Sequence, residues 1–478
     1  MTSSGDSGSK PVLEAGSTAW RVARADRLAF LVDPASYFSA LVDALRRARR
    51  SVLILAWEID SELRLLRGDV DPGHPVRLAA FLAWLVDRRP ELEVHILCWD
   101  FSPIFTIERE MLTSLKLLWT GGDRLHFHLD GHHPPGGSQH EKIVVVDDRV
   151  AFIGGIDPGR GRWDTSEHRP DDPRRTTPGG SSYRPFHDVQ AVLQGEAAAA
   201  LGELARERWR RSTGEPLAVP EASSEPWPEG VEPAVRDLDL GLVRTRPEHD
   251  GLPARTETEA FLKRLIARAE HSIYVENQYL TSGAIADALV ARLEEDDPPE
   301  ILLVTARDHG GWLESATMGG LRARFCRRLR EADRHHRLRI CYPAVAGGED
   351  PNVHTKLALA DDRWAYLGSA NLSNRSMRLD SECGLGIDAG DRDDVPAALR
   401  ELRLRLLAEH LGSDPETVAD REREGGLLAA VAALEGGRRT LRDLPDDGDE
   451  LPDVLEPLAR LADPKRSLGF GDLLDGLF

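Results

Sequence analysis

Two short motifs in this sequence combine the residue types that phosphate chemistry requires. Each has a histidine, a lysine and an aspartate in the spacing H-x-K-x4-D: His140, Lys142 and Asp147 in the first, and His354, Lys356 and Asp361 in the second. On an extended strand alternate side chains share a face, so the histidine and the lysine of each motif point the same way. An imidazole can attack phosphorus or transfer a proton, and an ammonium can stabilise charge on phosphoryl oxygens. The two motifs therefore predict phosphoryl transfer.

The residues around these motif positions indicate how they are placed. The positions between lysine and aspartate, 143–146 and 357–360, are apolar, which predicts a buried strand. We group the two aspartates with the catalytic set and expect each to organise the turn at the end of its strand. A second strand and a turn of small residues follow each motif, in AFIGGID and AYLGSAN, and small residues let a ligand approach the backbone. There Asn371 and Ser369 can donate hydrogen bonds to phosphate, whereas an ionised Asp157 can only accept.

The elements that must position these motifs occur twice along the chain. Residues 36–50 and 257–271 each predict an amphipathic helix, and a short apolar strand follows each one, SVLILAWEID and SIYVENQYL. A further helix-like and strand-like segment comes next in both halves. The sequence HEKIVVVDDRVAFIGGID then aligns without gaps to HTKLALADDRWAYLGSAN. The chain therefore contains an internal repeat.

Alternating helices and strands predict an α/β fold. We expect two similar α/β lobes, each a mixed sheet covered by helices. The stretch STGEPLAVPEASSEPWPEG, rich in Pro, Glu and Ser, suits a connection that runs over the surface. The expected divisions are a flexible tail at 1–19, a first lobe at 20–210, the connection at 211–255, a second lobe at 256–410, and a helical and acidic C-terminal tail at 411–478.

The composition limits the classes of function. The chain has 478 residues, of which 41% are hydrophobic and 30% charged, and no run approaches the ~18 apolar residues of a membrane-spanning helix. The polar N-terminus lacks the pattern of a secretory signal, and the four scattered cysteines have no CxxC spacing. We therefore expect a cytoplasmic protein with reduced thiols and no zinc site. A net charge of −20 disfavours nucleic acid as a substrate.

Taken together, these residues resemble the phospholipase D superfamily over residues 20–410. The likeness extends beyond the paired motifs to GGIDPGRGRWDT, YRPFHDVQ, IYVENQY and GSANLSNRSMRLDSE, a combination similar to the eukaryotic-like phospholipases D. The resemblance implies that the lobes pack as a pseudo-two-fold pair, with one active site built by both motifs between them. No metal or other cofactor is expected, because Lys142 and Lys356, helped by Asn371, can supply the positive charge.

The same resemblance implies a role for each polar residue. His140 would attack phosphorus to form a phosphohistidine, and His354 would protonate the leaving alcohol and then activate water. The symmetry of the sequence alone allows the reverse assignment. A histidine also needs a partner on its second ring nitrogen to fix its tautomer. By motif order, Asp188 of PFHDVQ would orient His354 and Glu382 of DSECGL would orient His140, so that each half completes the other's site.

Further residues are candidates for contact with the substrate. They end an expected strand or could line an entrance for acyl chains: Glu276, Asn277, Gln278, Trp57, Trp99 and Tyr279. Structural hydrogen bonds and core packing are the alternatives for these residues. His132 and His133 with His140 could suggest a metal cluster, but no acidic or cysteine partner has suitable spacing, so we expect a loop there.

The leading hypothesis is hydrolysis of a phospholipid headgroup ester to phosphatidic acid and a free alcohol, with transfer to another alcohol as a variant of the same reaction. A nuclease and a phospholipid synthase of the cardiolipin synthase type are the alternatives, because such a site recognises the phosphodiester and not its substituents. A noncatalytic scaffold is disfavoured because both His/Lys pairs are present. The expected partner is a phospholipid or another phosphodiester. We expect peripheral contact with zwitterionic rather than anionic membranes, or a soluble or short-chain diester as the substrate. The sequence leaves the oligomeric state open.

Overall fold

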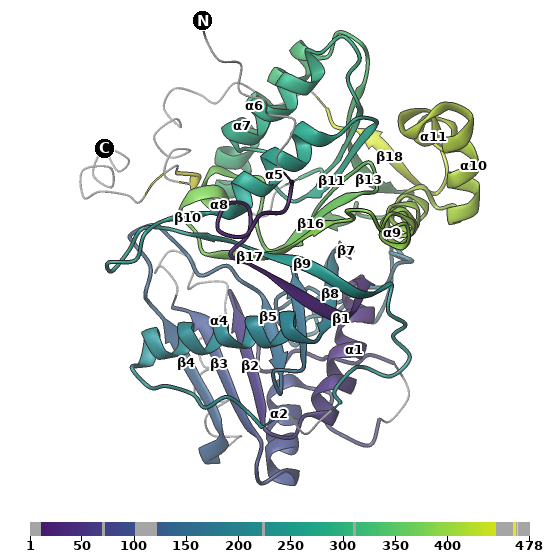
Figure 1. Ribbon diagram of the computed structural model, residues 1–478. Coiled ribbons are helices and arrows are strands. Elements are labelled where there is room, and N and C mark those ends of the chain that lie inside the picture. Colours follow the sequence, from purple (N-terminus) through teal and green to yellow (C-terminus); the bar gives the residue numbers. More distant parts are fainter. Residues whose placement is uncertain are drawn as a thin grey trace, which may run out of the picture.

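The computed structural model describes residues 11–68, 72–100, 122–221, 225–308, 312–445, 462–464 and 466, with the backbone alone for 312–317. These residues form a large mixed sheet with helices packed on it (Figure 1). The structure confirms the predicted α/β fold class, in which helices cover a sheet of mixed strand directions.

The first half of the chain builds one end of this sheet. In chain order its elements are β1 (Arg21–Val32), α1 (Pro34–Arg47), β2 (Ser51–Ala56), α2 (Leu78–Arg88), β3 (Glu93–Trp99), a short 3-10 turn (Gly122–Arg124), β4 (Leu125–Asp130), β5 (Ile143–Val146), β6 (Val150–Gly154), β7 (Phe186–His187), β8 (Val189–Gln194) and α4 (Glu196–Thr213). Strands β2, β3 and β4 are parallel. β5, β6 and β8 continue the sheet in antiparallel pairs.

The second half builds the other end in a similar order. Its elements are β9 (Val235–Arg246), β10 (Arg255–Thr256), α5 (Glu257–Arg268), β11 (Ser272–Asn277), α6 (Gly283–Leu293), β12 (Glu300–Val304), α7 (Trp312–Ala332), β13 (Leu338–Val345), β14 (Asn352–Val353), β15 (Lys356–Ala360), β16 (Trp364–Gly368), α8 (Asn374–Arg378), β17 (Glu382–Asp388), α9 (Asp394–Leu411), α10 (Pro415–Gly425), α11 (Leu427–Ala433) and β18 (Arg439–Asp443). β11, β12 and β13 are parallel, as are their counterparts in the first half.

The strands of both halves are hydrogen-bonded into one sheet. Their order is β4-β3-β2-β5-β6-β8-β1-β9-β17-β16-β15-β11-β12-β13-β18, and β10 pairs with β9. Apart from β18, corresponding strands of the repeat stand in corresponding places from the two ends. β1 and β9 pair antiparallel in the middle and join the halves. β7 and β14 form a separate parallel pair, which carries part of the site described below.

Helices on both faces explain why the motif strands are unbroken apolar runs. α1 and α2 contribute to one buried cluster with β2, β3 and β5, and α5 and α6 contribute to another with β11 and β12. α4 and α9 belong to a third cluster, which contains strands from both halves. Every residue of β5 and of β15 is buried as a result. The histidine and lysine of each motif therefore stand at the end of a strand that is fixed by packing on both sides.

The stretch 211–255, expected as a surface connection, contains the central strand β9. Leu238, Leu240 and Leu242 of β9 alternate along the strand and are buried, which is the pattern of a strand and not of a loop. The Pro-, Glu- and Ser-rich residues before β9 led us to predict a surface connection for the whole stretch. The ends of the described chain also pack on the body, since Val12 lies in the cluster formed by α5 and α6 and β18 pairs with β13.

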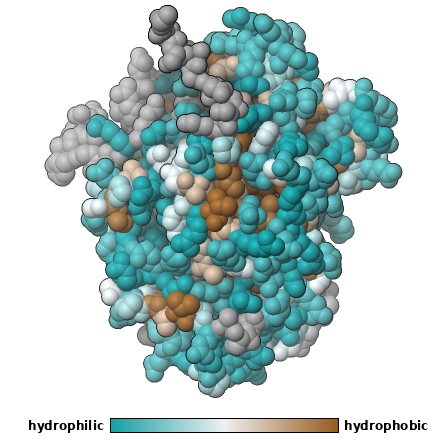
Figure 2. Space-filling model, viewed as in Figure 1, coloured by the Kyte–Doolittle hydropathy of each residue, from teal (hydrophilic) through white to brown (hydrophobic). Residues whose placement is uncertain are grey.

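The surface has few exposed large hydrophobic side chains. Among the described residues they are Val22, Leu129 and Val219. Figure 2 shows the face seen in Figure 1 as mostly hydrophilic, with hydrophobic residues gathered near its middle. In the part of the chain that the structure describes, no helix combines the length and the apolar character needed to cross a membrane.

Candidate active site

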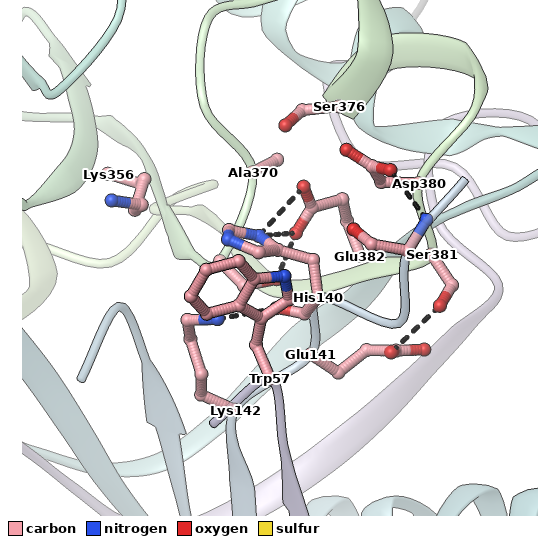
Figure 3. A network of polar contacts seen from close by, with 12 residues as sticks. Trp57, His140, Glu141, Lys142, Lys356, Ala370, Ser376, Asp380, Ser381 and Glu382 are labelled. Carbon is pink, nitrogen blue, oxygen red and sulfur yellow. Dashed lines mark hydrogen bonds and ion pairs between the residues drawn. The ribbon is translucent and has the colours of Figure 1, made fainter. Parts of the chain in front are cut away.

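The two motif histidines each meet a carboxylate from the other half of the chain. His140 Nδ1 lies 3.0 Å from Glu382 Oε2 and 3.1 Å from Oε1. His354 Nδ1 lies 2.8 Å from Asp188 Oδ2. Glu382 and Asp188 are fully buried, and the two histidines are almost so. Figure 3 shows the His140 imidazole between Glu382 and Lys356. The four residues singled out from the sequence as a crossed set are therefore together in space.

Backbone pairing between the halves explains this crossed arrangement. The His140 N–H donates to the Ser381 carbonyl at 2.9 Å, directly before Glu382. In the same way the His354 N–H donates to the His187 carbonyl at 2.8 Å, directly before Asp188. Each histidine segment thus runs beside the carboxylate segment of the other half. The short β7–β14 pair is one of these two contacts.

The two lysines are buried beside their histidines. Lys142 is 2% exposed and its Nζ lies 2.9 Å from Asp157 Oδ2, while Lys356 is 0% exposed and its Nζ donates to Gln278 Oε1 at 3.1 Å. Each ammonium also donates to the carbonyl of the histidine two residues before it. An ammonium has three N–H donors, so each lysine can still donate a hydrogen bond to a phosphate anion. The pair therefore supplies concentrated positive charge next to the two imidazoles.

Burial and neighbouring charge set the protonation of the histidines. Burial, followed by the ammonium groups of Lys142 and Lys356, lowers the pKa of His140 well below its usual value. Burial, followed by Lys356 and Arg162, lowers the pKa of His354 in the same direction. Both rings are therefore neutral at pH 7 before an anion binds. With the proton on Nδ1, held by the carboxylate, the Nε2 lone pair of each ring is available for chemistry.

The turns of small residues differ from what the sequence suggested. Ser369 does not present its hydroxyl to a phosphate, because that hydroxyl donates to Glu382 Oε2 at 2.5 Å. It therefore positions the carboxylate that holds His140. At the matching place Gly155 is required, since a Cβ there would lie 2.5 Å from Asp188 Oδ2. Asn371 is 4% exposed, and its Oδ1 has no hydrogen-bond partner among the described residues, so its role toward phosphate stays a prediction.

The candidates for substrate contact separate into two groups. Trp57 and Gln278 lie at the site: the Trp57 ring centroid is 6.0 Å from that of His140, and Gln278 holds Lys356. Trp99 stacks on Trp57 at 5.6 Å and is buried. Tyr279 is half-buried next to Gln278.

Glu276 and Asn277 are not free to contact a substrate. Glu276 is 0% exposed, with Oε2 2.9 Å from His187 Nε2 and Oε1 2.8 Å from His410 Nε2. Asn277 Oδ1 accepts the backbone N–H of Leu372 at 2.9 Å. Strand alternation places consecutive side chains on opposite faces, so a run of three polar residues cannot all face one cleft.

His132 and His133 point to partners other than His140. His133 Nε2 lies 2.9 Å from Asp100 Oδ1, and His132 Nδ1 lies 3.9 Å from Asp130 Oδ1. They lie between β4 and β5 in irregular backbone, as the sequence predicted.

Two arginine–carboxylate pairs near the site were missed from the sequence. Arg162 Nη2 lies 2.9 Å from Glu58 Oε1. Arg375 Nε lies 2.6 Å from Asp380 Oδ2. Their positive charges contribute to the low pKa values of His354 and His140, respectively. Arg162 lies in GRGRWDT and Arg375 in SNRSMRLDSE. The basic residues of these two stretches were the only sequence feature that could have indicated them.

The motif aspartates lie at the opposite ends of the motif strands from the lysines. Asp147 accepts three backbone N–H groups, from Arg49 at 2.7 Å, Arg50 at 2.7 Å and Ser51 at 2.8 Å. Asp361 accepts the three corresponding groups of residues 270–272. Each aspartate ties the turn after a motif strand to the start of the neighbouring strand. We therefore assign both a structural role and not a catalytic one.

Replacing Asp147 with asparagine is expected to destabilise the fold by roughly 1–3 kcal/mol, because one carboxylate oxygen that accepts buried N–H groups becomes a donor. Asparagine tolerates the left-handed backbone of this position, where φ is 52°, so the change isolates the hydrogen bonds. Denaturant unfolding measures the loss, and Asp239→Asn on β9, whose carboxylate is exposed, is the control. Equal stability of the two variants would contradict this role.

The activity of the site should depend on pH through Lys356. Burial lowers the pKa of Lys356 to about 7. The charged groups that act on it are Asp188, Lys142, Glu382 and Arg162. Since only the protonated form is a cation, kcat/KM is expected to fall as the pH rises above about 7. Lys356→Arg keeps its charge at every working pH, so its profile should lose this decline. A decline that persists unchanged in Lys356→Arg must come from another group.

The comparisons with known proteins agree with this geometry. The family model described as "Cardiolipin synthase, PLD-like domain" matches residues 262–396. The chain is 25% identical to phospholipase D1 of Saccharomyces cerevisiae over 88% of its own length and 31% of that protein. It is 26% identical to phospholipase D A of Dictyostelium discoideum over 80% of its own length and 35% of that protein. Phospholipase D alpha 1 of Arabidopsis thaliana is 22% identical over 81% of this chain and 65% of that protein. The chain is similar to the phospholipase D superfamily, as its motifs predicted.

The extent of these matches is also informative. The chain spans about a third of the yeast and Dictyostelium relatives and just under two thirds of the plant relative. Among solved structures, phosphatidylserine synthase of Haemophilus influenzae Rd KW20 is similar with a TM-score of 0.58 and 14% identity, over 87% of this chain and 96% of that one. That likeness shows the fold.

Proposed function

We propose that the chain is a phosphodiesterase that hydrolyses the headgroup ester of a phospholipid, giving phosphatidic acid and a free alcohol. The observation that carries this proposal is the crossed pairing of two neutral histidines, the mostly buried His140 with Glu382 and the buried His354 with Asp188, beside two buried lysines. Such a site offers one nucleophile, one proton carrier and two cations around a single phosphate. The named phospholipase D relatives support the choice of a lipid substrate.

In the proposed reaction His140 is the nucleophile. Its Nε2 attacks phosphorus, the bond from phosphorus to the headgroup oxygen breaks, and His354 protonates that oxygen as the alcohol leaves. His354 must hold a proton for this step, and the negative charge of the bound diester raises its pKa from the low value of the free site. His354 then takes a proton from water, which attacks phosphorus and releases His140.

The remaining residues stabilise charge and orientation. Lys142 and Lys356 meet the non-bridging phosphoryl oxygens, whose negative charge develops as the bonds exchange. Glu382 and Asp188 keep each ring turned so that Nε2 faces the phosphate. Trp57 lies against His140 and forms an apolar wall beside the nucleophile. We infer that the substrate reaches this wall by peripheral contact of the protein with a lipid surface.

The test is release of free headgroup from vesicles of phosphatidylcholine, phosphatidylethanolamine, phosphatidylglycerol or cardiolipin, with single-stranded DNA measured in parallel. Wild type is compared with His140→Ala and with His335→Ala, which removes an exposed histidine. Headgroup release that is lost only in His140→Ala supports the proposal. DNA cleavage with intact lipids would replace it with a nuclease. Adding glycerol or serine as acceptor distinguishes hydrolysis from synthesis of a new diester by the same intermediate.

A further inference from the structure

A second group of histidines and carboxylates lies outside the paired site. Its ligand-type atoms come from Asp33, His168, His187 and Glu409, and all lie within 4.8 Å of one another. All four side chains are buried, with exposed fractions of 1%, 2%, 0% and 6%. Asp33 follows β1, His187 ends β7, and Glu409 lies in the last turn of α9. Residues from both halves of the chain therefore converge on one enclosed point.

The contacts inside this group are crowded with acceptors. His187 Nδ1 lies 3.0 Å from Asp33 Oδ1 and 2.8 Å from Glu409 Oε1. His168 Nε2 lies 3.0 Å from the same Glu409 oxygen and 3.9 Å from Asp33 Oδ1. The single N–H that His187 can carry at Nδ1 is thus shared by two carboxylates. The carboxylates of Asp33 and Glu409 have oxygens within 4.8 Å of one another. Two buried negative charges this close repel one another strongly.

The second oxygen of each of these two carboxylates has no hydrogen-bond partner among the described residues. These oxygens, Asp33 Oδ2 and Glu409 Oε2, are buried. A buried acceptor without a partner is costly, and such atoms are uncommon in folded proteins. A cation bound between the two carboxylates would compensate both oxygens and remove the repulsion.

The second nitrogen of each histidine is held as it is in metal sites. His168 Nδ1 lies 2.9 Å from Asp164 Oδ2, and His187 Nε2 lies 2.9 Å from Glu276 Oε2. A carboxylate on the far nitrogen fixes the ring and makes the near nitrogen a better ligand. The near nitrogens, Nε2 of His168 and Nδ1 of His187, both face the two crowded carboxylates.

We propose that Asp33, His168, His187 and Glu409 bind a divalent metal ion. Two imidazoles and two carboxylates form a donor set that suits a first-row ion such as Zn²⁺ or Mn²⁺ better than Ca²⁺ or Mg²⁺, which prefer oxygen ligands alone. The site is closed by protein on all sides, so the ion is structural and takes no part in bond breaking. Binding requires both near nitrogens to be unprotonated, and protons are released when the metal enters.

This ion would tie the two halves together next to the Asp188–His354 pair. Glu409 belongs to the second half, and the other three ligands belong to the first. His187 precedes Asp188, and its carbonyl accepts the N–H of His354 at 2.8 Å. The metal thereby acts as a positioning element for the Asp188–His354 pair. Only this last consequence rests on the proposed function, because metal binding can be measured without any activity.

Metal analysis of the full chain, purified without chelator and dialysed against metal-free buffer, tests the proposal. We expect one Zn²⁺ or Mn²⁺ per chain in wild type, and loss of the metal in Asp33→Asn and Glu409→Gln. Glu276→Gln, which alters the carboxylate held by His187 and His410 but none of the four proposed ligands, is expected to weaken metal affinity roughly 10–100-fold. His126→Gln is the control, because His126 belongs to a separate group with Glu93 and His95 near the surface.

Stability provides a second readout that needs only wild-type protein. Removing the metal with a chelator is expected to lower the thermal midpoint, and restoring Zn²⁺ or Mn²⁺, but not Ca²⁺, is expected to raise it again. The proposal would be overturned by a folded wild-type protein that contains no metal and whose thermal midpoint does not change when Zn²⁺, Mn²⁺ or Ca²⁺ is added. Metal content that is equal in wild type and a folded Glu409→Gln variant, or recovery with Ca²⁺ alone, would also overturn it. Loss of metal with unchanged lipid turnover would leave the site in place and remove only its positioning role.

Discussion

Replacing His140 with alanine is expected to reduce phosphodiester turnover by about 10⁴-fold or more, because no other imidazole can form the covalent intermediate in its place. His354→Ala should be comparably slow with natural lipids, since the alcohol then leaves without a proton. The two variants differ with an aryl phosphodiester, whose leaving group needs no acid. Transfer of a radiolabelled phosphoryl group to the protein, followed by denaturing electrophoresis, measures the difference.

Label should accumulate on His354→Ala, because the intermediate forms on His140 and no base activates water to open it. His140→Ala should remain unlabelled. His335→Ala, with an exposed histidine removed, should turn over as wild type does. Label on His140→Ala and none on His354→Ala would exchange the two roles, which the symmetry of the motifs permits.

Glu382→Gln is expected to lower kcat by about 10³–10⁴-fold with little change in KM. The carboxylate accepts the Nδ1 proton of His140 at 3.0 Å and so leaves the Nε2 lone pair free. A glutamine amide can turn its N–H₂ toward Nδ1, which moves the ring proton to Nε2 and removes the nucleophile. Steady-state kinetics with thermal unfolding measured beside them separates this effect from loss of the fold.

Ser369→Ala is the matched control for that variant. It deletes the hydroxyl that donates to Glu382 Oε2 at 2.5 Å and keeps the carboxylate. Loss of one such hydrogen bond corresponds to a change of about 1 kcal/mol, or roughly fivefold in rate. A Glu382→Gln enzyme that is no slower than Ser369→Ala would show that the carboxylate does not set the tautomer of His140.

Sequence reasoning succeeded where a residue's chemistry is carried by a repeated local pattern. The H-x-K spacing on an apolar strand, in two matched copies, predicted where both His/Lys pairs lie, and the family resemblance, carried over by motif order, predicted that Asp188 and Glu382 lie beside the histidines. It failed where a side chain had a competing partner that lies far away in the sequence. Ser369 holds Glu382 instead of facing a phosphate, and Glu276 lies between two buried histidines.

The sequence by itself determined the class of fold, the strands that carry the motifs, and the residue types of the chemistry, because periodicity and spacing are local properties of the chain. Only the tertiary structure decided which polar residues are taken up by structural hydrogen bonds, as Ser369 and Glu276 are. It also joined the halves through β1 and β9 and brought Glu409 next to Asp33 and His187. Those outcomes depend on contacts between residues hundreds of positions apart, and no local pattern records how such segments pack.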